Sequence, residues 1–140
     1  MKREIIFRGK DVETGEWVEG YYVLFPTPCI YNPKTGEWHK VHPETVGQYV
    51  NTKDKTGKKV FEGDIVDAWS AGSHTTHGLV KFGATGFFIC RLGEKGPLSP
   101  WQLAPSNISG NELIDDSLTI IGNVIDTPEI LPCENKWKEF

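Results

Sequence analysis

Residues 45–66 read TVGQYVNTKDKTGKKVFEGDIV and alternate extended segments with turns centred on glycine. Valine, tyrosine and phenylalanine dominate the extended segments, and these residue types favour β-strands because their side chains pack well on a pleated surface. Gly57 occupies a hairpin-loop position that needs a positive φ angle, and Gly63 stands at a tight turn before Asp64. The segment therefore predicts a strand, a turn, a second strand, a tight turn and a third strand.

Comparable short runs recur along the chain. The β-prone runs lie at residues 4–8, 18–25, 79–82, 87–90 and 118–125. Thr-Gly-Glu-Trp at residues 14–17 returns at residues 35–38, and residues 56–59 are a weaker third copy. We interpret this echo as repeated hairpin chemistry rather than as a duplicated domain, because unrelated hairpins use the same residues for the same backbone geometry. One short helical turn is expected at residues 111–117.

The spacing of these runs indicates the fold class. Strands of roughly four to eight residues joined by glycine and proline turns are typical of mainly β domains, with an α+β arrangement as the alternative. About five strands between residues 45 and 125 suit a small SH3-like or OB-like barrel, and a closed sheet has no exposed edges. We expect residues 1–44 to form an N-terminal β-hairpin extension, residues 45–131 an SH3-like barrel and residues 132–140 a C-terminal tail.

Composition narrows the functional class. The chain has 140 residues and a formal net charge of −4, with both signs mixed along it. Proteins that hold duplex DNA through its phosphates usually carry a basic surplus, so duplex DNA is disfavoured as a partner. The cysteines, Cys29, Cys90 and Cys133, are odd in number and widely spaced, which favours reduced thiols in the cytoplasm. No signal peptide or membrane span is evident, so we expect a cytoplasmic protein with no membrane partner.

Several motifs resemble the signature of the YopX family, small proteins carried by phages and prophages. They are VGQY at residues 46–49, KDKTGK at 53–58, FEGDIV at 61–66, IIGNV at 120–124 and PEIL at 128–131. The resemblance implies an SH3-type barrel with an N-terminal β extension, in a phage or prophage accessory protein inside a bacterial host cell. The resemblance implies no established activity. The residues assigned here to the structural motif are Gly47, Gly57, Gly63, Asp64 and Gly122.

The sequence contains only weak signals for catalytic or metal-binding residues. Asp64 is a single carboxylate after a turn glycine, and such an aspartate normally accepts backbone N–H groups rather than acting in an acid–base pair. A small metal-dependent hydrolase remains a weaker alternative, with the potential ligands Cys29, His39, His42, His74 and His77. Zinc sites usually contain closely spaced ligand pairs, often Cys-x-x-Cys, which this chain lacks. We therefore expect no catalytic residue, no metal and no cofactor.

Aromatic residues suggest a binding function. They outnumber what one small barrel core holds, so some are expected on the surface, where they anchor protein partners or stack on bases. The candidate binding surface comprises Trp38, Tyr49, Lys53, Lys55, Trp69 and Trp101. Because basic residues interleave only thinly, we expect a non-catalytic module that binds a protein partner or self-associates. Trp137 and Phe140 either dock the tail on a neighbouring subunit or belong to a tail that is disordered or folded back on its own barrel. A module for single-stranded nucleic acid is the alternative.

Overall fold

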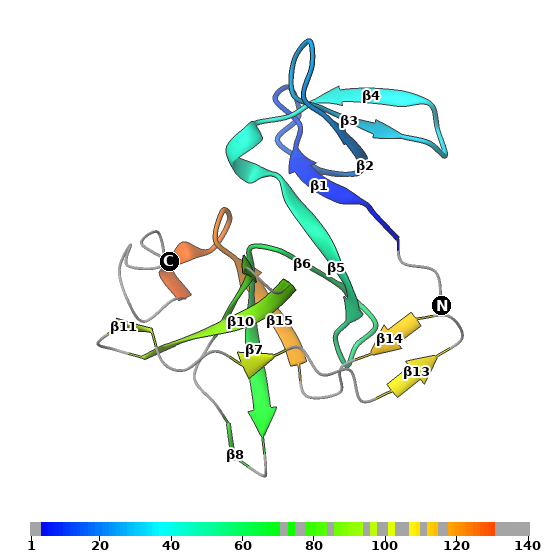
Figure 1. The fold of residues 1–140 in the computed structure, drawn as a ribbon. Coiled ribbons are helices and arrows are strands. Elements are labelled where there is room, and N and C mark those ends of the chain that lie inside the picture. The colour runs from blue at the N-terminus through cyan, green and yellow to red at the C-terminus, as the bar shows by residue number, and fades with distance from the viewer. Residues whose placement is uncertain are drawn as a thin grey trace. The chain divides into compact units, whose positions relative to one another are not determined.

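The computed structural model describes residues 4–70, 73–74, 78–83, 86–93, 96–97, 101–102, 107–109, 112–114 and 118–130 (Figure 1). The chain divides into two compact units. The N-terminal unit extends to Tyr49 and the C-terminal unit begins at Val50, so the division falls inside strand β5 (Gly47–Lys53). Each unit is described separately below.

The N-terminal unit is an antiparallel meander whose strands follow one another along the chain. Its elements are β1 (Phe7–Lys10), β2 (Trp17–Val23), β3 (Cys29–Asn32), β4 (Glu37–Lys40), the 3-10 helix η1 (Pro43–Thr45) and the first residues of β5. The pairing order is β5–β1–β2–β3–β4. Figure 1 shows β1 to β4 as successive blue to cyan strands joined by short connections. Gly15 and Gly36 have φ angles of 72° and 77° in the turns before β2 and β4, as the repeated Thr-Gly pairs predict.

The end of β4 returns to the end of β1. Asp11 and Val41 form an isolated antiparallel bridge, and the Val12 N–H donates to the Lys40 carbonyl at 2.9 Å. The meander therefore curls, which gives the sheet an inner and an outer side. Ile30 is fully buried and Val41 is 3% exposed, so the inner side supplies the apolar interior of this unit.

The C-terminal unit contains the end of β5 and the remaining strands. These are β6 (Lys59–Phe61), β7 (Asp64–Ser70), β8 (Ser73–His74), β9 (Gly78–Gly83), β10 (Gly86–Gly93), β11 (Gly96–Pro97), β12 (Trp101–Gln102), β13 (Asn107–Ser109), β14 (Glu112–Ile114) and β15 (Leu118–Asn123), followed by the 3-10 helix η2 (Pro128–Ile130). The main sheet has the order β11–β10–β9–β7–β15. In addition, β6 pairs with β5, β8 with β7, β12 with β10 and β13 with β14.

A valine-rich cluster forms the core of the C-terminal unit. Its buried members come from six strands and are Val50, Val60, Val66, Val80, Ile89 and Leu118. Phe87 and Ile120 pack against this cluster while remaining partly exposed. β-branched side chains suit this role because their single preferred rotamers pack regularly on a pleated sheet.

The mainly β fold class is confirmed, but the prediction of a closed barrel is wrong. In the described residues, β11 and β15 are the two ends of the main sheet and no pairing joins them. Strands β5 and β6 pair with each other and contact β15 through the turn between them instead of extending its ladder. Closure requires every strand to pair on both sides, so this arrangement is open.

The expected helical turn at residues 111–117 is also wrong. Glu112–Ile114 is strand β14, because it pairs with β13 and, in parallel, with Lys53. The described helices are single 3-10 turns, and neither has the length or apolar character that crossing a bilayer requires. The domain boundaries expected at residues 44 and 131 stay a prediction.

Candidate binding surface

Strand register aligns three aromatic side chains on one side of the N-terminal sheet. Directly paired residues in antiparallel strands point to the same side. Tyr21 of β2 pairs with Tyr31 of β3, and Tyr31 pairs with Trp38 of β4. The neighbouring position pairs His39 with the fully buried Ile30, which marks the inner side. Tyr21, Tyr31 and Trp38 therefore form a row across the outer side.

The aromatic row is open to solvent. The exposed fraction is 62% for Trp38 and 51% for Tyr21, whereas Tyr31 between them is half-buried. The ring centroids of Tyr31 and Trp38 lie 4.6 Å apart at an interplanar angle of 42°, so these two rings support each other. Such large exposed rings normally mark a surface that binds something, because burying each one stabilises a complex substantially.

Cationic side chains share this outer side with the aromatic row. Alternation along β2 places Trp17 and Glu19 on the same side as Tyr21, and their partners on β1 are Lys10 and Arg8. The Arg8 guanidinium carbon lies 4.5 Å from the centroid of the Trp17 ring, and the Lys10 ammonium lies 5.2 Å from it. We call this surface the aromatic face; its residues are Arg8, Lys10, Trp17, Glu19, Tyr21, Val23, Cys29, Tyr31, Trp38 and Lys40.

A hydrogen-bonded carboxylate fixes the turn between β1 and β2. Asp11 Oδ1 accepts the N–H groups of Glu13 at 2.7 Å and Thr14 at 3.2 Å, while Asp11 Oδ2 lies 2.9 Å from His39 Nδ1. The Glu13 N–H bond and then the His39 contact hold the pKa of Asp11 below its ordinary value. His39 Nε2 lies 3.2 Å from Glu37 Oε2. This chain of contacts connects the turn to β4 and so positions Trp38, the residue between Glu37 and His39.

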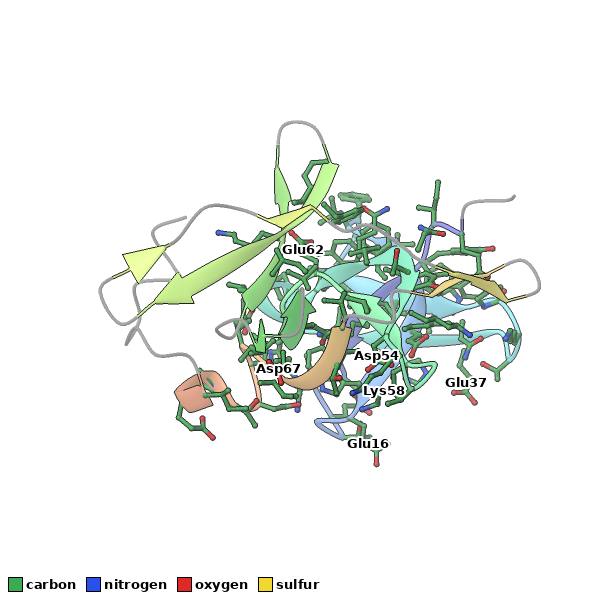
Figure 2. All side chains as sticks on the ribbon, turned by 90° about the horizontal axis from the view of Figure 1, so that it is seen from below. Glu16, Glu37, Asp54, Lys58, Glu62 and Asp67 are labelled. Atoms are coloured by element: carbon green, nitrogen blue, oxygen red, sulfur yellow. The ribbon has the colours of Figure 1, made fainter. Side chains whose placement is uncertain are left out.

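A second buried carboxylate organises the turn between β5 and β6. Asp54 is 1% exposed, and Figure 2 shows it close to Lys58 on this turn. Its Oδ1 accepts the Thr56 N–H, the Thr56 hydroxyl and the Lys58 N–H at 2.9, 2.7 and 3.0 Å. Its Oδ2 accepts the Ile120 N–H of β15 at 3.0 Å. Burial raises the pKa of Asp54, but these hydrogen bonds outweigh it and leave the pKa below its ordinary value.

Asp64 also has a structural environment. It is 1% exposed, and its Oδ2 accepts the Phe61 N–H at 2.8 Å across the tight turn. Gly63 has a φ angle of 93°, donates to the Val80 carbonyl at 2.9 Å and accepts from the Val124 N–H at 3.0 Å. A carboxylate buried in this way has no access to a substrate, so it stabilises the turn before β7.

The structure distributes the predicted binding residues over both units. Trp38 is exposed on β4 in the N-terminal unit. Lys53 is half-buried at the end of β5, and Lys55 is exposed on the following turn. Tyr49 is only 4% exposed, so its assignment to an exposed surface is wrong. Its neighbour Val50 is buried as well, so the burial of Tyr49 comes from packing around β5 and not from simple alternation along the strand.

The remaining predicted positions lie in regular elements. Trp69 is in β7 and Trp101 is in β12, and their side chains lie outside the described part of the structure. Gly47 begins β5, and Gly57 has a φ angle of 89° in the β5–β6 turn. Gly122 follows a register shift in the pairing of β15 with β7. Trp137 and Phe140 lie outside the described residues.

The described residues contain no group of three His, Cys, Asp or Glu side chains that could hold a metal ion. Cys29 lies on the outer side of the N-terminal sheet and His39 on the inner side, so these two do not converge. His42 is exposed beyond β4, and His74 lies in β8. His77 lies outside the described residues.

Sequence reasoning missed most of the aromatic face. Tyr21, Trp17 and Arg8 appear in the sequence without any motif that joins them. The β3–β4 hairpin could have been used to predict part of this face, because a four-residue loop between Asn32 and Glu37 places Tyr31 opposite Trp38. Tyr21 aligns with them only through the register of β2 with β3, which no local pattern specifies.

The fold and this surface define a strand-rich protein with an exposed aromatic sheet face. Residues 6–132 match the YopX protein family, and the chain belongs to this family. The chain is similar to the crystal structure of protein EF1440 from Enterococcus faecalis, with 21% sequence identity, a TM-score of 0.49 and coverage of 93% of this chain and 99% of that chain. No curated protein matches the chain.

Proposed function

We propose that this protein is a non-catalytic binding module and that the aromatic face is its contact surface. The observation that carries the proposal is the row of Tyr21, Tyr31 and Trp38, which strand register aligns across three neighbouring strands and leaves open to solvent. Rigid aromatic anchors contribute much of the binding energy in interfaces, because they bury a large area and lose little conformational entropy. Asp11 and His39 keep this row in place from the inner side.

The burial of the candidate reactive groups favours binding over catalysis. The carboxylates of Asp54 and Asp64 are each 1% exposed and are hydrogen-bonded to backbone N–H groups. A general acid or base needs direct reach to a substrate proton, which neither position provides. The YopX family resemblance supports a role as an accessory protein of a phage or prophage in the bacterial cytoplasm. The mixed charges of the whole chain favour a protein partner or a second copy of the chain over duplex DNA.

A paired comparison tests the contact surface. The variant Tyr21→Ala/Trp38→Ala removes the two most exposed rings of the row, and Phe82→Ala is the matched control, since Phe82 is 58% exposed on β9 of the C-terminal unit. Tagged proteins are incubated with a bacterial extract, and retained proteins and nucleic acids are quantified. A ligand that the wild type and Phe82→Ala retain, and the double variant loses, supports the proposal. Equal retention by all three proteins contradicts it.

Self-association is tested separately with the same variants. Sedimentation velocity over a concentration series shows whether the wild type forms a larger species. If the aromatic face joins two copies, the Tyr21→Ala/Trp38→Ala variant sediments as a monomer at concentrations where the Phe82→Ala protein does not. Far-UV circular dichroism and urea unfolding establish that each variant is folded.

A further inference from the structure

We infer that the aromatic face binds a single strand of nucleic acid. This inference rests on the proposed function and names the chemistry of the partner. The face combines exposed planar rings with cationic groups, and each of these features matches one part of an unpaired strand. Bases present flat π-surfaces to the rings, and phosphates present negative charge to the cations.

The rings provide the stacking part of the match. Tyr21 and Trp38 each expose about half or more of their surface, at 51% and 62%, on the same side of an antiparallel sheet. Tyr31 between them packs against Trp38 with a centroid separation of 4.6 Å, which restricts the orientation of the Trp38 ring. A sheet that presents aromatic rings to splayed bases is a recurrent solution for single strands. In a duplex the base faces are already stacked, so this surface selects unpaired nucleotides.

The cations provide the electrostatic part of the match. Arg8, Lys10 and Lys40 lie on the aromatic face with one carboxylate, Glu19, although the whole chain has a net charge of −4. The positive groups are therefore concentrated beside the rings. Arg8 and Lys10 lie 4.5 and 5.2 Å from the Trp17 centroid, so both positive charges are held beside the aromatic row by cation–π contacts.

The residue types of the aromatic face argue against a protein as its binding partner. The buried centres of protein–protein interfaces are enriched in aromatic residues and arginine but depleted in lysine. Here Lys10 pairs with Trp17, and Lys40 follows Trp38 on the same side of β4, so a protein interface would have to bury ammonium groups among the rings. A phosphate backbone instead provides charge partners for these groups.

Fluorescence anisotropy with labelled oligonucleotides tests the inference. The probes are oligo(dT) and oligo(rU) of about ten nucleotides, within the span that small single-strand-binding modules cover, and a duplex of the same length. We expect the single strands to bind at low salt and the duplex to bind more weakly. With three cations engaged, the logarithm of the association constant falls with the logarithm of the salt concentration at a slope of about −2.

Substitutions assign the binding to the aromatic face. Trp38→Ala is expected to weaken single-strand binding roughly 5- to 100-fold, whereas Trp38→Phe retains most of it. Trp38→Leu keeps apolar area without a stacking ring and is expected to resemble Trp38→Ala. Lys40→Gln reduces the salt slope by about 0.7, and Lys58→Gln, which removes an exposed lysine of the β5–β6 turn, leaves it unchanged.

The outcomes separate this inference from the proposed function. Absence of oligonucleotide binding by the folded wild type at low salt overturns the nucleic-acid assignment, as does equally tight duplex binding. The aromatic face then stands as a contact surface only if the extract comparison finds a protein whose retention depends on Tyr21 and Trp38. Oligonucleotide binding that Trp38→Ala and Lys40→Gln leave unchanged overturns the assignment of nucleic acid to this face.

Discussion

Replacement of Asp54 is the most informative perturbation of the fold. The carboxylate accepts four hydrogen bonds, three within the β5–β6 turn and one from the Ile120 N–H of β15. Thr56 and Lys58 are exposed, so water replaces part of what Asp54→Ala removes from the turn. Ile120 is half-buried, and its N–H loses a charged acceptor. We expect Asp54→Ala to lower the free energy of unfolding by about 2–4 kcal/mol, because the Ile120 N–H left unpaired costs roughly 1–3 kcal/mol and the loss of the turn hydrogen bonds adds about 1 kcal/mol.

The companion variant Asp54→Asn separates shape from charge. Its side chain keeps one acceptor oxygen, so it satisfies either the turn donors or the Ile120 N–H but not both. We expect a loss between zero and that of Asp54→Ala, on the order of 1–2 kcal/mol. The measurement is urea unfolding at neutral pH, with Glu129→Gln as a control that neutralises an exposed carboxylate of the same unit.

The pH dependence gives a second readout of the same carboxylate. The pKa of Asp54 in the folded protein lies below its ordinary value, so its contribution is fully present above the unfolded pKa of about 3.9. That contribution disappears as the pH falls through the folded pKa. The wild type and Asp54→Asn are therefore expected to converge in stability as the pH falls from about 4 through the lower folded pKa. Neutral-pH stabilities for Asp54→Ala and wild type within about 0.5 kcal/mol of each other would refute the reasoning.

Three further substitutions test other parts of the structure. A methyl group at Gly122 overlaps the Thr127 hydroxyl and lies 2.9 Å from Ile130 Cδ1. Gly122→Ala is therefore expected to lower the free energy of unfolding by about 1–3 kcal/mol. An unchanged urea midpoint would contradict this packing. Asn51 has a φ angle of 62°, so Asn51→Ala should be less stable than Asn51→Gly by about 1 kcal/mol in the same assay, and the reverse order excludes this backbone conformation. The pKa of Asp11 is lowered in the folded protein, so the contribution of this carboxylate to the free energy of unfolding is complete above the unfolded pKa of about 3.9 and is lost at lower pH. Asp11→Asn should therefore reduce the dependence of the free energy of unfolding on pH in the acid range.

Local sequence patterns predict the turns and most strands of this protein. The hairpin around residues 83–86 has the expected arrangement, since Phe82 of β9 pairs with Phe87 of β10. Gly57 and Gly63 have the positive φ angles that their positions in the turns require. These features depend on residues close together in the chain, so composition and spacing contain the necessary information.

Long-range pairing explains what the sequence did not reveal. The open main sheet depends on which strands pair at its ends, and the strand at Glu112–Ile114 depends on partners in β13 and β5. Likewise, the aromatic face exists only because the register of β2, β3 and β4 brings alternate residues together. A shift of one residue in that register would turn Tyr21 to the opposite side, and no short motif encodes this choice.

The residues of the candidate binding surface were also predicted only in part, because their exposure depends on long-range packing. The excess of aromatic residues correctly placed Trp38 on the surface but also placed Tyr49 there, and the burial of Tyr49 depends on the packing around β5. Sequence composition indicated that the cations were thinly spread among the aromatics. In the folded N-terminal unit, the cations of Arg8 and Lys10 lie over the Trp17 ring, although these two residues precede Trp17 by nine and seven positions in the sequence.

The bond from Ile120 to Asp54 spans 66 positions of the chain. The ribosome therefore releases the β5–β6 hairpin well before the last acceptor site of its central carboxylate is filled. A nascent polypeptide that ends before β15 presents this oxygen to water and lacks the contact that fixes the hairpin to β15. Arrival of Leu118–Asn123 thus supplies the Ile120 donor to Asp54, and the order of translation makes this contact a late one.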